Sequence, residues 1–151
     1  MKLLVQAAQL SQQKKLPVYV LASCMGHKSI LGEQGKQYGF RMYASSSPDE
    51  WLGLFFSAEY VLTDSFHGTV FSLIAHKKFL TPCDRPNLRA EELLQHIGLS
   101  DRYAPETVSP IDDSIFWDAV DLSLEQLRTP SLAYLQSTLR SKHNSMNVKT
   151  L

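Results

Sequence analysis

The sequence predicts an α/β fold built on a parallel sheet, from three observations. Short runs rich in β-branched and aromatic residues, such as PVYVLA at 17–22 and YVLTD at 60–64, have the composition of buried strands. Helical apolar spacing follows, as in GTVFSLIAH at 68–76. The two patterns alternate along 151 residues, a length that fits one domain. Because parallel strands are joined by right-handed helical crossovers, we expect a Rossmann-like three-layer α/β/α arrangement.

Four strands are expected in this sheet. They span 18–22, 42–45, 60–64 and 78–81. Pro82 ends the last one, since proline cannot donate to a sheet ladder.

Helices are expected on both sides of these strands. Apolar residues at spacings of three and four predict a first helix at Leu3 to Leu10. A second should run from 48 to 59, with Ser47 as its N-cap and Pro48 at the first helical position. A third covers 68–76.

The C-terminal third is also predicted to be largely helical. One helix spans roughly 89–97 and is closed by Gly98. Beyond an irregular stretch at 100–114, a helical pattern is interrupted at Pro130. Residues 143–151 lack periodicity, so we expect one domain over 1–142 followed by a disordered tail.

Composition excludes several classes of function. Fifteen basic residues balance fifteen acidic ones, so no broad positive field is available for nucleic acid. Cys24 and Cys83 are isolated, which argues against a zinc site or a disulfide framework and favours a reduced, cytoplasmic protein. No apolar segment approaches the ~18–20 residues that would cross a bilayer, so the chain is not expected to be transmembrane.

The loop after the third strand carries the candidate site. It holds Asp64, Ser65, His67, Gly68 and Thr69 at the carboxyl end of a strand, where open α/β sheets bind ligands. The following helix presents unpaired N–H groups and the positive end of its dipole to an anion. Gly68 would remove a side chain from the anion's path, Ser65 or Thr69 could cap the helix, and His67 could supply a proton.

Each of these residues also has a structural explanation. Ser65 can be only the N-cap, and Gly68 can serve a tight turn. Asp64 at a strand end often bonds neighbouring backbone. His67, which lies at the mouth of the loop and not on an apolar helical stripe, has the stronger case for a functional role.

Two other patterns give weaker evidence for a functional site. Cys24 and His27 follow the first strand, but this pair is typical of an ordinary strand-to-helix loop. A serine hydrolase is disfavoured because the pattern G-x-S-x-G is absent around Ser65.

At this loop the sequence resembles the polysaccharide pyruvyl transferase family. The resemblance lies in SSPDEWLGLFFSAEYVLTDSFHGTVFSLIAHKKF, with TDSFHGTVFSL as its most specific part, and continues through LRAEELLQHIGLSDRY and PSLAYLQSTL. It covers roughly Pro17 to Leu139. The sequence departs from the family pattern at two places. Glu59 stands where the family usually has Asp, and AHKKF replaces an Asn-Lys-Pro-Phe ending.

The resemblance implies transfer of a pyruvyl group from phosphoenolpyruvate to two sugar hydroxyls as a ketal, in cell-surface or exopolysaccharide biosynthesis. It implies a GT-B-like fold, of which this chain corresponds to the C-terminal half. A comparable N-terminal domain is therefore an expected partner. The other expected partners are a small-molecule donor and a carbohydrate acceptor, and the half-enzyme alone is expected to be inactive.

The resemblance also assigns roles to residues. His67 becomes the catalytic residue that donates or relays a proton, and Ser65, Phe66, Gly68 and Thr69 belong to the binding segment. Arg89 begins the next helix and is a candidate second anion ligand, because a guanidinium grips carboxylate or phosphate with two hydrogen bonds. A solvated first-turn arginine is the alternative, and Arg85 is a weaker candidate. The scheme requires no metal and no cofactor beyond the donor substrate.

Two other functions remain open. The first is a GT-B glycosyltransferase that uses a nucleotide sugar, although no acidic residue near a strand end is persuasive as a ribose ligand. The second is a non-catalytic binding or assembly module, against which the presence of His67 and Gly68 argues mildly.

Overall fold

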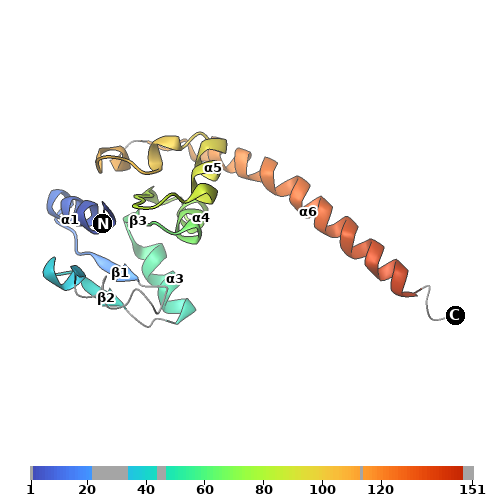
Figure 1. The fold of residues 1–151 in the computed structure, drawn as a ribbon, viewed down its shortest axis with the longest axis horizontal. Helices are drawn as coiled ribbons and strands as arrows, with labels where there is room; N and C mark the ends of the chain where they lie inside the picture. The colour runs from blue at the N-terminus through green and yellow to red at the C-terminus, as the bar shows by residue number, and fades with distance from the viewer. Residues whose placement is uncertain (1, 22–33, 44–46, 113, 148–151) are drawn as a thin grey trace.

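The structure is a computed structural model that describes residues 2–21, 34–43, 47–112 and 114–147, with the side chains of 141–147 left out. Its elements, in chain order, are α1 (Lys2–Lys14), β1 (Tyr19–Leu21), β2 (Arg41–Tyr43), α3 (Pro48–Ser57), β3 (Tyr60–Leu62), α4 (Phe66–Ile74), β4 (Lys78–Leu80), α5 (Leu88–His96), the 3₁₀ turns η2 (Ser100–Arg102) and η3 (Ser109–Asp112), and α6 (Trp117–Asn147). The α/β class predicted from the sequence is confirmed (Figure 1).

The described strands form two parallel pairs and not one four-stranded sheet. β1 pairs with β2, and β3 pairs with β4, with Val61 aligned to Phe79. The two pairs share one apolar cluster, because Val18, Val20 and Leu62 all pack against its buried residues Leu4, Ala7 and Phe40. The predicted parallel pairing is therefore confirmed, whereas the single sheet of a three-layer Rossmann-like fold is not.

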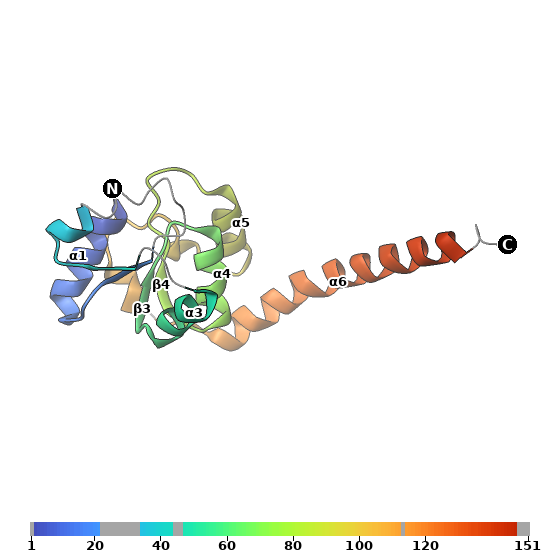
Figure 2. The ribbon, with the colours of Figure 1, turned by 90° about the horizontal axis from the view of Figure 1, so that it is seen from below.

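The β3–β4 pair separates two parts of the core. Val61 and Phe79 face a cluster that includes Leu73 of α4 and Leu94 of α5. Leu80 faces the opposite cluster, which α1 and η3 complete. Figure 2 shows the strand pair between α1 and the group of α3, α4 and α5. This position fixes where α4 begins, directly after β3.

The helices begin near the residues that the sequence marks. Ser47 caps α3 in a reciprocal capping box with Glu50, and Pro48 takes the first helical position, as predicted. The helix expected at 68–76 begins two residues earlier, at Phe66, because Ser65 is its cap. The helix expected at 89–97 is α5, which Asn87 caps.

The last helix, α6, differs most from its prediction. It runs through Pro130 without the expected interruption and continues to Asn147, five residues past the boundary at 142. Val120 anchors its first turns in the core. Beyond these turns α6 projects away from the rest of the molecule (Figures 1 and 2). No helix among the described residues is both long and apolar enough to cross a membrane.

Candidate functional site

The hinge between β3 and α4 is held by short hydrogen bonds from its own side chains. Thr63 continues the strand, because its N–H donates to the Leu80 carbonyl at 3.1 Å. The Thr63 Oγ1 atom then accepts from the Ser65 N–H at 3.2 Å. Ser65 in turn caps α4, since its Oγ atom accepts from the Gly68 N–H at 3.5 Å. Ser65 is thus the N-cap, as one of the two sequence explanations proposed.

Gly68 is required by the close approach of α4 to Thr63. A Cβ atom at position 68 would lie 2.1 Å from the Thr63 Oγ1 atom and 2.9 Å from its Cβ atom, both too close for real contacts. Gly68 is buried, and its φ is not positive. The missing side chain therefore makes room for Thr63, and a tight turn with positive φ does not account for this glycine.

Thr69 faces the interior. Its side chain is fully buried, and its Oγ1 atom lies 3.1 Å from the Ser65 carbonyl, to which it donates, and 3.1 Å from the Thr81 Oγ1 atom. Ser72, one turn later, donates to the Gly68 carbonyl at 2.8 Å. These bonds fix the first turn of α4 against the end of β4.

Three predicted site residues lie together on the outer side of this turn. His67 is exposed and Phe66 is half-buried, and their rings meet edge to face with centroids 5.9 Å apart. The guanidinium of Arg89, from the first turn of α5, lies over the Phe66 ring at 4.9 Å from its centroid. Phe66 is therefore the shared contact between the imidazole and the guanidinium.

Two backbone donors remain available beside these side chains. The Gly68 N–H is bonded to the Ser65 side chain and the Thr69 N–H to the Ser65 carbonyl. Within the described part of the chain no acceptor is recorded for the N–H groups of Phe66 and His67, as is usual for the first residues of a helix. This end of α4 combines two N–H donors, the helix dipole, an imidazole and a guanidinium, a set suited to an anion.

Asn87 links the start of α5 to the residues just before α4. Its Oδ1 atom caps α5 by accepting from the Ala90 N–H at 3.3 Å, while its Nδ2 group donates to the Asp64 carbonyl at 3.1 Å. Its own N–H donates to the Tyr103 hydroxyl at 2.9 Å. The position of Arg89 relative to α4 thus depends on a residue that sequence analysis missed, although an Asn immediately before a helical run is a recognisable capping signal.

The remaining polar groups near the hinge are poorly suited to nucleophilic chemistry. Burial, with a smaller contribution from the charge of Asp64, raises the pKa of the Cys83 thiol. The thiol therefore stays protonated near neutral pH, which makes it a weak nucleophile. The side chains of Asp64 and Arg85 are both exposed. Asp64 contributes to the hinge through its backbone carbonyl, which accepts the hydrogen bond from Asn87.

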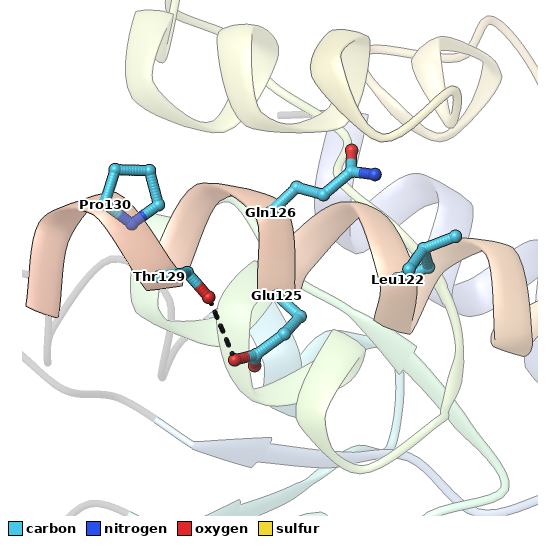
Figure 3. A pocket seen from close by; sticks show the side chains of 5 residues that line it. All are labelled: Leu122, Glu125, Gln126, Thr129 and Pro130. Atoms are coloured by element: carbon cyan, nitrogen blue, oxygen red, sulfur yellow. Dashed lines mark hydrogen bonds between the residues drawn. The ribbon is translucent and has the colours of Figure 1, made fainter. Parts of the chain in front are cut away.

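Neither a metal site nor the surface pocket coincides with this cluster. Among the described residues no group of three or more His, Cys, Asp or Glu side chains could hold a metal ion. Cys24 and His27 lie outside the described residues. A shallow pocket lies on α6 instead and is lined by Leu122, Glu125, Gln126, Thr129 and Pro130 (Figure 3).

The comparison with protein families covers the hinge and the elements next to it. Residues 10–83 match the polysaccharide pyruvyl transferase family. The match confirms the resemblance predicted from the sequence, and it contains the hinge, β3, α4 and β4. It ends at Cys83, so α5 with Arg89 lies beyond the matched residues. Searches of curated proteins and of solved structures found no significant match.

Proposed function

We propose that this chain acts in pyruvyl transfer, with phosphoenolpyruvate bound at the start of α4. The observation that carries the proposal is the grouping of His67, the free Phe66 and His67 N–H groups and the Arg89 guanidinium, at a hinge that lies within the family match. Phosphoenolpyruvate offers two anionic groups, a phosphate and a carboxylate. A helix N-terminus and an arginine suit such a pair of anions.

The reaction needs a proton and a leaving group in balance. A proton adds to the methylene carbon of phosphoenolpyruvate, which becomes the methyl group, while C2 takes on cationic character. The oxygen of one sugar hydroxyl bonds to C2, and the oxygen of the second displaces inorganic phosphate. Of the two hydroxyl protons, one leaves with the phosphate and the other returns to the residue that protonated the methylene carbon, and the product is a ketal that keeps the carboxylate. The imidazole of His67 is a proton donor in this turn of α4, and its exposure leaves it accessible to phosphoenolpyruvate.

Binding tests the first half of this proposal. In a ¹H–¹⁵N NMR titration, phosphoenolpyruvate should shift the Phe66 and His67 amide signals before others. Arg89→Gln should weaken this binding by roughly tenfold or more, since a hydrogen bond to a charged group is worth about 1.5–3 kcal/mol. His96→Ala, which removes an exposed histidine of α5, is the matched control and should bind as the natural chain does. Shifts confined to other residues, or stronger binding of a nucleotide sugar, would favour the glycosyltransferase alternative.

Catalysis tests the second half. In a preparation that transfers the pyruvyl group, His67→Ala should lower kcat by about 10²-fold or more without a matching loss of thermal stability, because general acid catalysis contributes about 10²–10⁴-fold. The reaction run in D₂O should place one deuterium in the methyl group of each ketal. Normal kcat in His67→Ala together with a lowered melting temperature would instead assign a structural role to this histidine.

A further inference from the structure

The guanidinium of Arg89 is held beside α4 by a contact that leaves its charge available. It lies over the Phe66 ring, 4.9 Å from the ring centroid, and such a ring attracts a cation without neutralising it. Within the part of the chain that the structure describes, no ion pair with a carboxylate is recorded for Arg89. An anion at the start of α4 can therefore pair with a guanidinium whose position is already set.

Asn87 joins the helix that carries Arg89 to the residues before α4, and its hydrogen bonds have different partners. Its Oδ1 atom accepts from the Ala90 N–H at 3.3 Å and so caps α5. Its backbone N–H donates to the Tyr103 hydroxyl at 2.9 Å. The bond from its Nδ2 group to the Asp64 carbonyl, at 3.1 Å, is the one that reaches the hinge. This bond therefore sets the start of α5 relative to the start of α4.

Tyr103 is attached in turn to the end of β4. Thr81 pairs with it in a parallel bridge, in which the Thr81 N–H donates to the Arg102 carbonyl at 2.7 Å and the Ala104 N–H donates to the Thr81 carbonyl at 2.9 Å. The Thr81 Oγ1 atom also lies 3.1 Å from that of Thr69, in the first turn of α4. Both helix starts are therefore attached to the end of one strand, and the side-chain bond across the hinge closes the ring of contacts.

We propose that Asn87 is a positioning residue for the donor and that it acts through Arg89. The inference rests on the proposed function, because the anionic groups in question are the phosphate and the carboxylate of phosphoenolpyruvate. A ligand with two such groups binds more tightly when the groups that receive them are fixed in advance, since binding then orders less of the protein. The bond from Asn87 to the Asp64 carbonyl joins the two elements that supply these receiving groups, namely the N–H groups of α4 and the guanidinium of α5. Asn87 itself needs no contact with the donor.

Asn87→Ser separates this bond from the helix cap. Serine is about as good an N-cap as asparagine, so α5 keeps its cap, but the side chain no longer carries an amide donor for the Asp64 carbonyl. The exchange also leaves the charge of the site unaltered. Ser47→Asn, the reverse exchange at the cap of α3, is the matched control and should bind phosphoenolpyruvate as the natural chain does. Cooperative urea unfolding of both variants checks that the fold is intact.

A double-mutant cycle tests whether Asn87 acts through Arg89. In NMR titrations of the whole chain, Asn87→Ser should raise the dissociation constant of phosphoenolpyruvate about two- to tenfold, the factor that one neutral hydrogen bond is worth. In a chain that already carries Arg89→Gln, the same exchange should have no further effect, because the group that it positions is gone. Equal weakening in both backgrounds would overturn the proposal, as would unchanged affinity in Asn87→Ser.

A second measurement needs no ligand. Protons above an aromatic ring resonate upfield, so the δ-methylene protons of Arg89 should lie upfield of their position in Phe66→Leu, and Asn87→Ser should move them toward that position. If the natural chain does not bind phosphoenolpyruvate, the proposed function fails, while this signal still decides whether Asn87 positions Arg89. If the natural chain binds it but Asn87→Ser changes neither the signal nor the affinity, the role of Asn87 fails alone.

Discussion

Gly68 and Thr63 act as one packing unit at the start of α4. The Thr63 hydroxyl holds the Ser65 N–H, and the same side chain occupies the space that a Cβ atom at position 68 would need. This contact brings the first turn of α4 onto the end of β3. The orientation of the Phe66 and His67 N–H groups therefore depends on a threonine that has no part in the proposed reaction.

Gly68→Ala should destabilise the chain. Its methyl group would meet the Thr63 side chain, and overpacking of this kind costs about 1–3 kcal/mol in unfolding free energy. Gly53→Ala is a suitable control, because nothing lies within 4 Å of the position where its Cβ would be built, in the interior of α3. That control should gain about 0.5–1 kcal/mol. Urea unfolding measures both values, and equal stability of the two variants would contradict the packing role of Gly68.

The sequence allowed some of these residue roles to be predicted and not others. The caps at Ser47 and Ser65 were predictable, because capping depends on the cap and the next three residues. The partner of Gly68 was not, since the clash depends on how closely the helix lies against the strand. Exposure of His67 at the mouth of the loop agrees with the position that the pattern predicted.

At the scale of elements, one exposed cluster ties α1 to β3 and η3. Lys14 in the last turn of α1 lies 2.6 Å from the Asp112 carboxylate, and the Tyr60 hydroxyl donates to the same carboxylate at 3.3 Å. The hydrogen bond from Lys14 is the main cause that lowers the pKa of Asp112 below 3.8. The same bond to Asp112 raises the pKa of Lys14 above 10.5.

This pair should make stability depend on pH in a defined direction. The folded-state pKa of Asp112 is depressed, so its contribution is present above pH 3.8 and is lost as the pH falls through the lower folded value. The contribution of Lys14 is present below pH 10.5 and is lost as the pH rises through its higher folded value.

Asp112→Asn should remove the acid-side part of this dependence, measured as the difference in unfolding free energy from the natural chain at pH 7 and below pH 3.8. That difference should shrink at the lower pH. Asp118→Asn, which alters an exposed carboxylate with no recorded ion pair among the described residues, should keep the acid-side dependence. A difference for Asp112→Asn that does not change with pH would show that the pair does not couple folding to protonation.

The existence of the elements was more predictable than their assembly. Helices and strands appear where apolar periodicity, caps and β-branched runs indicated them. The strands are only three residues long, however. Whether β1 joins β3 by a ladder, or only through the apolar cluster against which Val20 and Leu62 pack, is decided by packing that no local pattern encodes. The same holds for α6, whose continuation through Pro130 is contrary to local propensity.

For the whole molecule, the candidate site forms one exposed wall in the described residues. The starts of α4 and α5 supply the imidazole, the guanidinium and the N–H groups, and His67 is open to solvent. Such a surface can attract an anion through local donors. Holding a donor and a sugar acceptor in reacting geometry would require contacts from a second side.

We therefore expect the isolated chain to bind phosphoenolpyruvate weakly and to form no ketal. Correct positioning of two reactants can account for about 7–11 kcal/mol of a barrier, and this contribution needs a second wall. An NMR titration should approach saturation only at millimolar concentrations of phosphoenolpyruvate. No inorganic phosphate should be released with any sugar tested. Steady phosphate release coupled to ketal formation would show that this chain completes the site by itself.

The contact between Thr63 and Gly68 also limits how this hinge can evolve. A side chain cannot be gained at position 68 while a threonine fills the space above it, and a bulkier residue at 63 would press on the backbone of α4. A residue smaller than threonine at 63 would open this space, so a side chain at 68 is best accommodated after such a change. The two positions, one at the end of a strand and the other inside a helix, therefore share one space, and the order in which they change decides whether the hinge is strained.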